Sequence, residues 1–293
     1  MKIFSIIVCF NPKLDTLLNL CNKLINNNYN IVLVDNSNDL KLVELIQSEN
    51  IHLIQLKENI GIAAAQNKGI SYAMDKNADL FIFFDQDSEI EDDFLEELLK
   101  PLSLDIPMVT SPVFIDKKAG FQFPSFKLNK FGLLKQTKPI NKLVYDVDVI
   151  ISSGSATNRI TLNIVGLMNE DYFIDFVDTE WSLRCSRQKV PLKVVPSARM
   201  IHAIGDRSLD LKIMRLFIHS PLRSYYKLRN SFLFIRSPYV PLLFGLKEIT
   251  SALIHNFIII FVVKNKREYF KNYCQAILDG IIGEIGKKSS KWI

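Results

Sequence analysis

Two carboxylates separated by a single residue follow an uninterrupted apolar segment. Residues 80–84 read Leu-Phe-Ile-Phe-Phe, and Asp85, Gln86 and Asp87 come directly after them. A continuous apolar run of this kind is typical of a strand that a parallel sheet buries on both faces. Alternate residues of an extended segment point the same way, so Asp85 and Asp87 can face one ligand. Two carboxylates at such a strand end suit Mg²⁺ or Mn²⁺ held together with a diphosphate.

The same acids have a second interpretation, in which they begin a helix. Ser88 and Glu91 have the spacing of a capping box, and the acids around them would complement the positive end of a helix that ends near Pro101. The residue pattern alone leaves both interpretations open.

The elements that must position these acids alternate between strand and helix. Apolar runs predict strands at residues 3–10, 31–34, 51–56, 80–84, 108–113, 144–151 and 192–195. Apolar residues at helical spacing predict helices at residues 14–25, 40–47, 63–74 and 211–235. An irregular insertion is expected over residues 114–142. This alternation predicts an α/β fold whose mainly parallel sheet has helices on both faces.

Length and composition limit the class of protein. The 293 residues, 48% of them hydrophobic, allow one large domain with an appendage, expected at residues 1–205 and 206–293. The net charge of +5 comes without a basic stripe interleaved with aromatic residues, so no nucleic-acid partner is expected. The four cysteines are scattered among apolar neighbours, which predicts free thiols in the cytoplasm.

Two further polar sites are candidates with alternatives. The turn at residues 152–155, which includes Gly154 and Ser155, precedes an expected helix, where backbone N–H groups can contact a hydroxyl or phosphate group. An ordinary capped turn fits equally well. His202 is an isolated histidine, which is more often structural than a metal ligand.

The C-terminal part is apolar and then basic. Residues 240–263 are rich in apolar side chains, but their uninterrupted run, 257–263, is shorter than the roughly 20 residues of a spanning helix. Lys264, Lys266 and Arg267 follow at once. This pattern fits a helix lying on the inner face of the cell membrane, and it fits equally well a helix packed on the preceding domain.

Short motifs follow one another in order along the chain. They are residues 8–12 (Val-Cys-Phe-Asn-Pro), 34–37 (Val-Asp-Asn-Ser), 58–61 (Glu-Asn-Ile-Gly) with 63–67, 84–87 (Phe-Asp-Gln-Asp), and 178–181 (Asp-Thr-Glu-Trp) with Arg184. In this order and spacing they resemble the inverting glycosyltransferases of family 2, which have the GT-A fold. Within that family the chain most resembles bacterial rhamnosyltransferases of cell-surface polysaccharide assembly. The resemblance covers about residues 1–205, and a cluster at 225–230 extends it.

The resemblance implies a role for each matching residue. Residues implied to hold the nucleotide or line the donor are Phe10, Asn11, Asp35, Asn59, Gly61, Asn67, Asp85 and Gln86. Asp87 resembles the metal-coordinating acid, and His202 matches a position that can add a ligand. Asp178 resembles the general base. Gly154, Ser155, Asp175 and Trp181 are the residues expected to contact the acceptor.

Spacing favours Asp178 over the neighbouring acids as the base. If a helix begins near Asp178, Glu180 points about 200° around it and cannot share its face. Trp181 then lies near Asp178 and can form an acceptor wall. Asp175 stays the alternative base. The family often has Glu-Asp where this chain has Val177 and Asp178, so the partner acid is missing or displaced to Asp175. A metal and a helix N-terminus nearby are expected to keep the pKa of Asp178 low.

The expected reaction is transfer of a sugar with inversion to a lipid-linked glycan. The Gln in residues 85–87 is frequent in the rhamnosyl group, which favours dTDP-L-rhamnose as donor and O-antigen or capsule synthesis as context. The alternatives are a UDP-hexose donor, a nucleotidyltransferase, and a non-catalytic assembly subunit associated with the membrane.

Overall fold

The computed structural model describes residues 1–37, 42, 49–116, 120–137, 143–202, 208–211 and 214–289. The helix expected at residues 40–47 therefore lies outside the described residues except for Leu42, and the side chain of His202 lies outside them as well.

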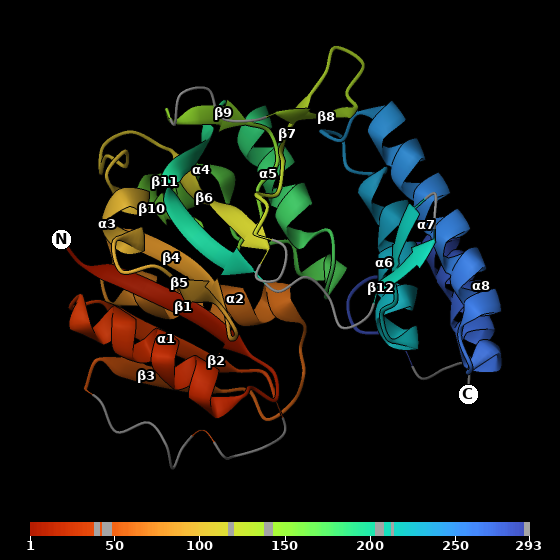
Figure 1. The fold of residues 1–293 in the computed structure, drawn as a ribbon, viewed down its shortest axis with the longest axis horizontal. Coiled ribbons are helices and arrows are strands. Elements are labelled where there is room, and N and C mark those ends of the chain that lie inside the picture. Colours follow the sequence, from red (N-terminus) through yellow and green to blue (C-terminus); the bar gives the residue numbers. More distant parts are fainter. Residues whose placement is uncertain are drawn as a thin grey trace.

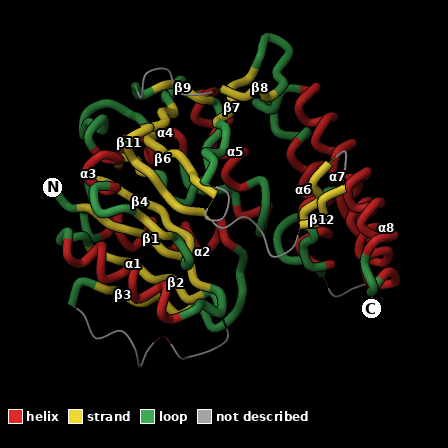
Figure 2. Tube along the Cα trace, viewed as in Figure 1, coloured by secondary structure: helices red, strands yellow, loops and turns green. Residues whose placement is uncertain are grey.

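A nine-stranded sheet is the centre of the described part of the chain (Figures 1 and 2). In chain order its strands are β1 (Ile3–Cys9), β2 (Asn30–Asp35), β3 (Ile51–Gln55), β4 (Leu80–Asp85), β5 (Glu89–Ile90), β6 (Val109–Asp116), β9 (Tyr145–Val147), β10 (Ala156–Asn158) and β11 (Leu192–His202). Their order across the sheet is β3-β2-β1-β4-β10-β6-β11-β5, with β9 also pairing with β11. Strands β1 to β4 are parallel, and the short β10 is antiparallel to both β4 and β6. The expected mixed α/β fold is confirmed.

Helices cover both faces of the sheet (Figure 1). One face packs against α1 (Leu14–Asn26) and α3 (Phe94–Leu99), and the other against α2 (Ile62–Asp75), α4 (Arg159–Val165) and α5 (Val177–Arg187). Successive side chains of a strand point to opposite faces, so Ile82 and Phe84 of β4 join the first core, while Phe81 and Phe83 join the second. The strand must therefore be apolar throughout.

The C-terminal helices stand beside the α/β domain (Figure 1). They are α6 (Pro221–Phe234), α7 (Leu242–Val262) and α8 (Lys266–Ile282). Phe234 and Phe244 enter the core under the sheet, while Phe173 of the α/β domain packs among Tyr225 and Tyr226. The boundary near residue 205 stays a prediction, and the two parts share apolar contacts across it.

Several elements differ from the sequence prediction. Residues 208–211 and 214–217 pair as strands β12 and β13, so the helix predicted from residue 211 begins at Pro221, where Pro suits the first turn and Ser220 Oγ accepts from Arg223 N at 3.2 Å. The strand predicted at 144–151 is shorter, and the one at 192–195 continues to His202 past an irregular register between Val195 and Arg199. Within the insertion, β7 (Ser125–Leu128) and β8 (Leu134–Thr137) form a hairpin.

The capping box expected at Ser88 and Glu91 does not form. The Ser88 hydroxyl pairs with Ser153 Oγ at 3.0 Å, β5 intervenes, and α3 begins only at Phe94. The acids that follow β4 are therefore not explained by helix capping at Ser88.

Candidate active site

A cavity of about 500 Å³ lies at the carboxyl ends of β1, β2 and β4. The residues that line it come from these strand ends, from the start of α2, from the loop before α5 and from the start of α6. They are Val8, Phe10, Asn36, Asn59, Gly61, Ile62, Asp85, Gln86, Asp87, Phe173, Ile174, Ser220, Leu222, Arg223 and Tyr226. The position agrees with the general location of ligand sites in open α/β sheets. The predicted donor residues Phe10, Asn59, Gly61, Asp85 and Gln86 are among them.

The turn after β4 is held to the end of β1 by Gln86. Its Oε1 accepts from Phe10 N at 2.6 Å, and its Nε2 donates to Phe10 O at 3.2 Å. The side-chain amide thus copies a backbone pairing and continues the β1–β4 ladder by one residue. This contact fixes the turn that carries Asp85 and Asp87, so we assign Gln86 a positioning role in addition to its place on the wall.

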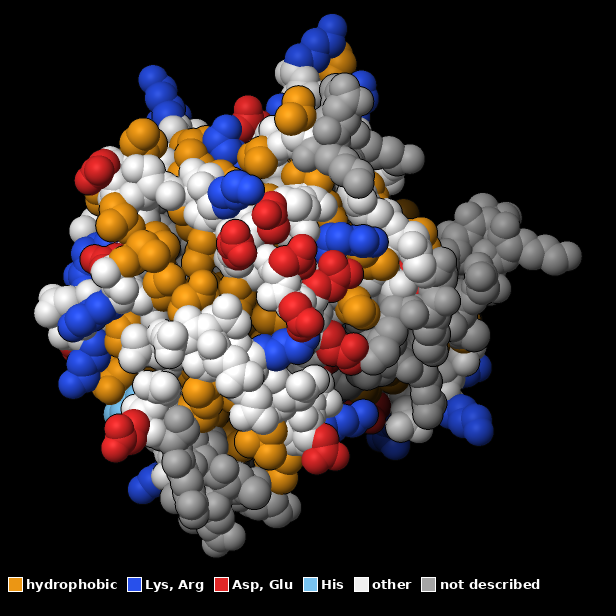
Figure 3. Space-filling view, turned by 60° about the vertical axis from the view of Figure 1, so that its left-hand side comes forward, with side chains coloured by type: hydrophobic (Ala, Val, Ile, Leu, Met, Phe, Trp, Pro, Cys, Tyr) orange, Lys and Arg blue, Asp and Glu red, His pale blue; other side chains and the backbone are white. Residues whose placement is uncertain are grey.

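The carboxylate of Asp87 is exposed in the cavity, and that of Asp85 is half-buried beside it. Oxygen ligands of this type fit Mg²⁺ or Mn²⁺, which commonly bind one or two carboxylates together with substrate phosphates and water. Within the residues that the structure describes, no group of three or more His, Cys, Asp or Glu side chains is arranged to hold a metal by itself. The donors therefore fit a cation that shares its ligands with a diphosphate. Figure 3 shows one face of the molecule on which several Asp and Glu side chains lie close together near the centre, with others scattered around them.

Asn36 connects the second strand to the loop before α2. Its Nδ2 donates to Asn59 Oδ1 at 3.1 Å, and its Oδ1 accepts from Ile60 N at 2.8 Å. Asn59 Oδ1 also accepts from Gly61 N at 2.9 Å. This network places Asn36 and Asn59 on the cavity wall. Asn36 was not among the predicted site residues, although it stands inside the 34–37 motif.

Gly61 lets the loop before α5 pack closely against the start of α2. Its φ is +93°, and a Cβ there would lie 2.7 Å from both the side chain and the carbonyl oxygen of Phe173. Ile62 N donates to the same carbonyl at 2.7 Å. The close approach that Gly61 permits is therefore that of the loop before α5, in addition to any approach by a ligand.

Asp178 lies in the first turn of α5, half-buried. Its pKa is raised to about 7, mainly by burial and next by the negative charge of Asp85, with a smaller contribution from Asp175. A hydrogen bond from the backbone of Ser152 lowers the pKa but does not offset these effects. Desolvation and the two neighbouring carboxylates thus raise the pKa of Asp178, whereas a metal and the helix N-terminus were expected to keep it low. A pKa near neutrality suits a general base.

The loop before α5 has an unusual backbone. Phe173, Asp175 and Phe176 have φ values of 56°, 63° and 65°, a region that costs non-glycine residues about 1–3 kcal/mol each. Asn230 of α6 is fully buried, and its Nδ2 donates to the carbonyls of Tyr172 (2.7 Å), Ile174 (2.7 Å) and Asp175 (3.3 Å). The C-terminal helices therefore hold the loop that leads into Asp178.

Arg229 orients the side chain of Asn230, which clamps the loop before α5. Its guanidinium donates to Asn230 Oδ1 through Nε (2.9 Å) and Nη2 (2.7 Å), which orients the amide of Asn230 toward the loop. It also donates to Gly286 O at 2.7 Å and Asp171 O at 3.3 Å. Sequence reasoning did not assign roles to Arg229 and Asn230; the 225–230 cluster was the available signal.

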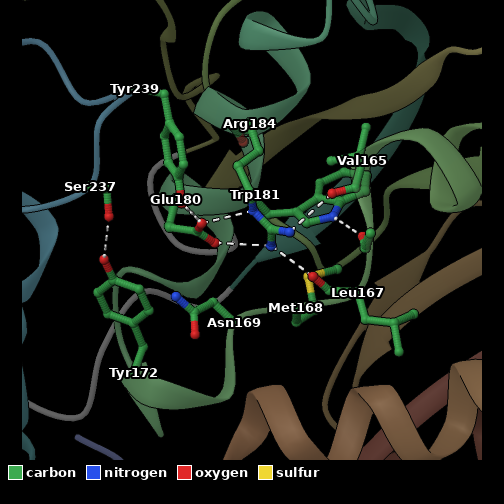
Figure 4. Close-up of polar contacts among 12 residues, drawn as sticks. Val165, Leu167, Met168, Asn169, Tyr172, Glu180, Trp181, Arg184, Ser237 and Tyr239 are labelled. Carbon is green, nitrogen blue, oxygen red and sulfur yellow. Dashed lines mark hydrogen bonds and ion pairs between the residues drawn. The ribbon is translucent and has the colours of Figure 1, made fainter.

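Glu180 and Trp181 are not in the cavity lining, and Figure 4 shows the polar contacts that hold them. Glu180 is fully buried, paired with Arg184 Nε at 2.7 Å and bonded to the hydroxyl of Tyr239. Trp181 is buried, and its Nε1 donates to Gly166 O at 2.9 Å. The acceptor wall predicted for Trp181 is therefore not formed, because the indole belongs to the core beneath α5. Exclusion of Glu180 as the base agrees with its place in this network.

Other predicted residues support the site from outside the cavity lining. Asn67 bonds to the backbone of Met168 through both amide atoms, at 2.9 Å each, and to Glu170. Asp35 is buried and accepts from Ser37 N at 3.0 Å, and Ser37 Oγ accepts from Asn11 N at 2.8 Å. Asn67 and Asp35 are thus engaged by other parts of the protein, whereas the side chain of Asn11 is exposed. None of the three lines the cavity, and their donor contacts stay predictions.

The turn at residues 152–155 faces β4 and not an open surface. Gly154 N donates to Phe83 O at 2.7 Å, and Ser155 O accepts from Phe83 N at 2.9 Å. Both residues are buried, so the acceptor contacts predicted for Gly154 and Ser155 are not available. Ser153 Oγ instead accepts from Asp85 N at 3.0 Å, so the turn positions the end of β4.

Comparison with known proteins gives the same family from sequence. The model of "Glycosyl transferase family 2" matches residues 5–161. The chain is 41% identical over 287 residues to "dTDP-rhamnosyl transferase RfbF" of Shigella flexneri, covering 97% of each chain. It is 23% identical over 269 residues to "Low-salt glycan biosynthesis hexosyltransferase Agl10" of Haloferax volcanii, covering 87% of this chain and 84% of that one.

Solved structures share the fold at low sequence identity. GalNAc-T7 with UDP, GalNAc and Mn²⁺ aligns with a TM-score of 0.60 at 18% identity, over 87% of this chain and 55% of that one. S. aureus TarS 1–349 in complex with UDP-GlcNAc aligns with a TM-score of 0.57 at 16% identity, over 97% of this chain and 82% of that one.

Proposed function

Because this chain belongs to glycosyl transferase family 2, and is thus an inverting glycosyltransferase, we propose that it transfers L-rhamnose from dTDP-L-rhamnose to a hydroxyl group of a lipid-linked glycan. The observation that carries the choice of donor is the similarity to a dTDP-rhamnosyl transferase, 41% identical over 97% of both chains. The proposed context is cytoplasmic assembly of a surface polysaccharide such as O-antigen or capsule.

The proposed chemistry assigns each acid a task. Asp178 accepts the proton of the acceptor hydroxyl, whose oxygen attacks the anomeric carbon from the face opposite the diphosphate. The bond from that carbon to the diphosphate oxygen breaks, thymidine diphosphate leaves, and the configuration inverts. Asp87 would hold Mg²⁺ or Mn²⁺, which supplies charge neutralisation of the departing diphosphate. Asp85, beside Asp87, would face the sugar, and Asp175 would orient the acceptor.

A UDP-hexose donor is the second candidate, supported by the similarity to a hexosyltransferase and by the fold shared with a UDP-GlcNAc complex. A nucleotidyltransferase or a non-catalytic subunit has no comparable support now that the family is known.

Product release separates the two donors. Purified chain with Mn²⁺ and a membrane extract as acceptor should release thymidine diphosphate from dTDP-L-rhamnose faster than it releases UDP from UDP-glucose or UDP-galactose. Rhamnose is a 6-deoxy sugar, so its site should lack a hydrogen-bond partner for a 6-hydroxyl. The 6-hydroxyl of glucose or galactose would then be left unpaired in the site, which weakens binding of the UDP-hexoses measurably. Faster turnover of the UDP-hexoses would reassign the donor, and equal release by Asp178→Asn would reject the base.

We further propose that α7 and α8 rest on an anionic membrane surface. Within the described residues, α7 is the helix that is long and apolar enough to cross a membrane by length and composition. It packs against α6 and α8 and carries Lys247 and Glu248, which favours a surface position over a spanning one. Its apolar side chains that face outward, with those of α8, are Leu242, Leu243, Leu246, Ile254, Phe257, Phe261, Val262, Phe270, Leu278, Ile281 and Ile282.

The exposed cation Lys264 follows α7, and the exposed cations Lys266 and Arg267 begin α8, where the three would meet lipid headgroups. Vesicles with phosphatidylglycerol should carry the chain upward in flotation, less so as salt rises. Replacing these three cations by Gln should weaken flotation without changing thermal stability. No flotation at low salt would instead favour a protein partner for this surface.

A further inference from the structure

Arg223 is the cationic side chain on the wall of the cavity. Among the described residues that line it, no other is Lys or Arg, whereas Asp85 and Asp87 are acidic. A nucleotide sugar carries its negative charge on the diphosphate. A cavity with two carboxylates therefore needs positive charge before such a ligand can enter, and Asp87 with a cation supplies it from one side only.

The geometry of Arg223 suits a phosphate group. Its Nη2 lies 3.1 Å from Asp175 Oδ1, and its Nε lies 3.4 Å from Asp175 Oδ2, so one edge of the guanidinium faces Asp175. The side chain of Arg223 is 46% exposed, and that of Asp175 is 16% exposed. A planar guanidinium on an anchored carboxylate is preorganised to bind phosphate oxygens, which it does in bidentate fashion.

The position of Arg223 is fixed by neighbours that do not depend on a ligand. It sits in the first turn of α6, where Ser220 Oγ accepts from its backbone N at 3.2 Å. The same helix carries Asn230, which clamps the loop that bears Asp175. The helix and the loop thus hold the guanidinium and its carboxylate partner in one rigid arrangement at the cavity.

We propose that Arg223 contacts the diphosphate of the nucleotide-sugar donor directly, so that the C-terminal helices complete the donor site. This rests on the proposed function. The competing explanation is that Arg223 only neutralises Asp175 and supports the loop. The two differ in what happens when Asp175 is already neutral.

A double-mutant cycle on binding tests the difference. The affinities of thymidine diphosphate, UDP and thymidine are measured by calorimetry with Mn²⁺ for the full chain, for Arg223→Ala, for Asp175→Asn and for the double variant. Loss of a charged hydrogen bond should weaken diphosphate binding by about 10- to 100-fold in Arg223→Ala and leave thymidine within about twofold. The same loss should persist when Arg223→Ala is made in the Asp175→Asn background.

Two controls separate direct contact from general electrostatics. Lys287 pairs with Glu58 at 3.2 Å outside the cavity lining, so Lys287→Ala removes the same charge and should change the affinity by less than about threefold. Arg223→Lys keeps the charge without the fork and should recover part of the loss.

Each outcome separates the direct contact of Arg223 from the proposed function. A loss that disappears in the Asp175→Asn background, or that is equal for thymidine, overturns the direct contact while the proposed function stands. A wild-type chain that binds UDP and not thymidine diphosphate overturns the donor in the proposed function, while the contact of Arg223 with the diphosphate survives. A wild-type chain that binds neither diphosphate overturns both.

Discussion

Replacing Asn230 by Ala should lower both the stability of the protein and its turnover. The variant loses two short hydrogen bonds to the carbonyls of Tyr172 and Ile174, and it removes the acceptor of the Arg229 guanidinium. A net hydrogen bond is worth about 1 kcal/mol and an unsatisfied buried group costs about 1–3 kcal/mol, so the free energy of unfolding should fall by about 3–5 kcal/mol. The strained loop would then relax, and misplacement of Asp178 by an ångström can cost about 100-fold in turnover.

The assay is urea unfolding at pH 8 together with turnover at saturating donor. Asn256→Ala is the matched control, because Asn256 is also buried but donates to Ala252 O at 2.9 Å within its own helix. That control should lose about 1 kcal/mol at most and keep its turnover. If Asn230→Ala loses less than Asn256→Ala, or keeps full turnover when folded, the clamp is not what holds the loop.

Other perturbations have equally definite outcomes. Asp178→Asn should lower turnover by about 100-fold or more yet keep donor affinity, which calorimetry checks. Because the pKa of Asp178 is raised to about 7, kcat/KM should fall about tenfold per pH unit below that value. The folded chain without ligands also binds a proton that the unfolded chain releases near pH 4, so the stability contribution of Asp178 declines as the pH rises from about 4 to about 7, and Asp178→Asn should raise Tm at pH 8. Asp87→Ala should abolish the rise in Tm that Mn²⁺ with thymidine diphosphate gives the wild type, and activity unaffected by excess EDTA would contradict the metal role. Gly61→Ala should cost at least about 2 kcal/mol in urea unfolding, because its Cβ would lie 2.7 Å from Phe173.

The sequence predicted the parts of the fold that local patterns encode. Strands β1, β2, β3 and β4 fall within a residue or two of their predicted bounds. In β1, β2 and β4 the reason is that a strand buried on both faces must be largely apolar, whereas the half-buried β3 still has apolar residues at Ile51, Leu53 and Ile54. The position of Asp85 and Asp87 at the cavity was also predictable, because the carboxyl ends of parallel strands lie at the same edge of the sheet. What is encoded locally is thus the frame of the cavity and the acids on its rim.

The missed features depend on contacts distant in sequence. Asn67 was predicted to contact the donor, but its side-chain amide hydrogen-bonds to the backbone of Met168, some 100 residues later in the chain. Trp181 looked like an acceptor wall, but its N–H is satisfied by Gly166 in the core. The positive φ values at Phe173, Asp175 and Phe176 have no local signal in the sequence, because these non-glycine residues adopt them where tertiary contacts such as that of Asn230 hold the loop.

The place of β10 in the sheet has a consequence for the nascent chain. Strand β10 pairs with β4, which is completed some 70 residues earlier. At about 5–20 residues per second, β4 waits roughly 4–14 s on the ribosome with an open edge rich in phenylalanine. Such an edge is a template for intermolecular pairing until residues 156–158 cover it. Polypeptides released before that point should be clients of chaperones and should aggregate on their own, while those that include β10 have closed the edge.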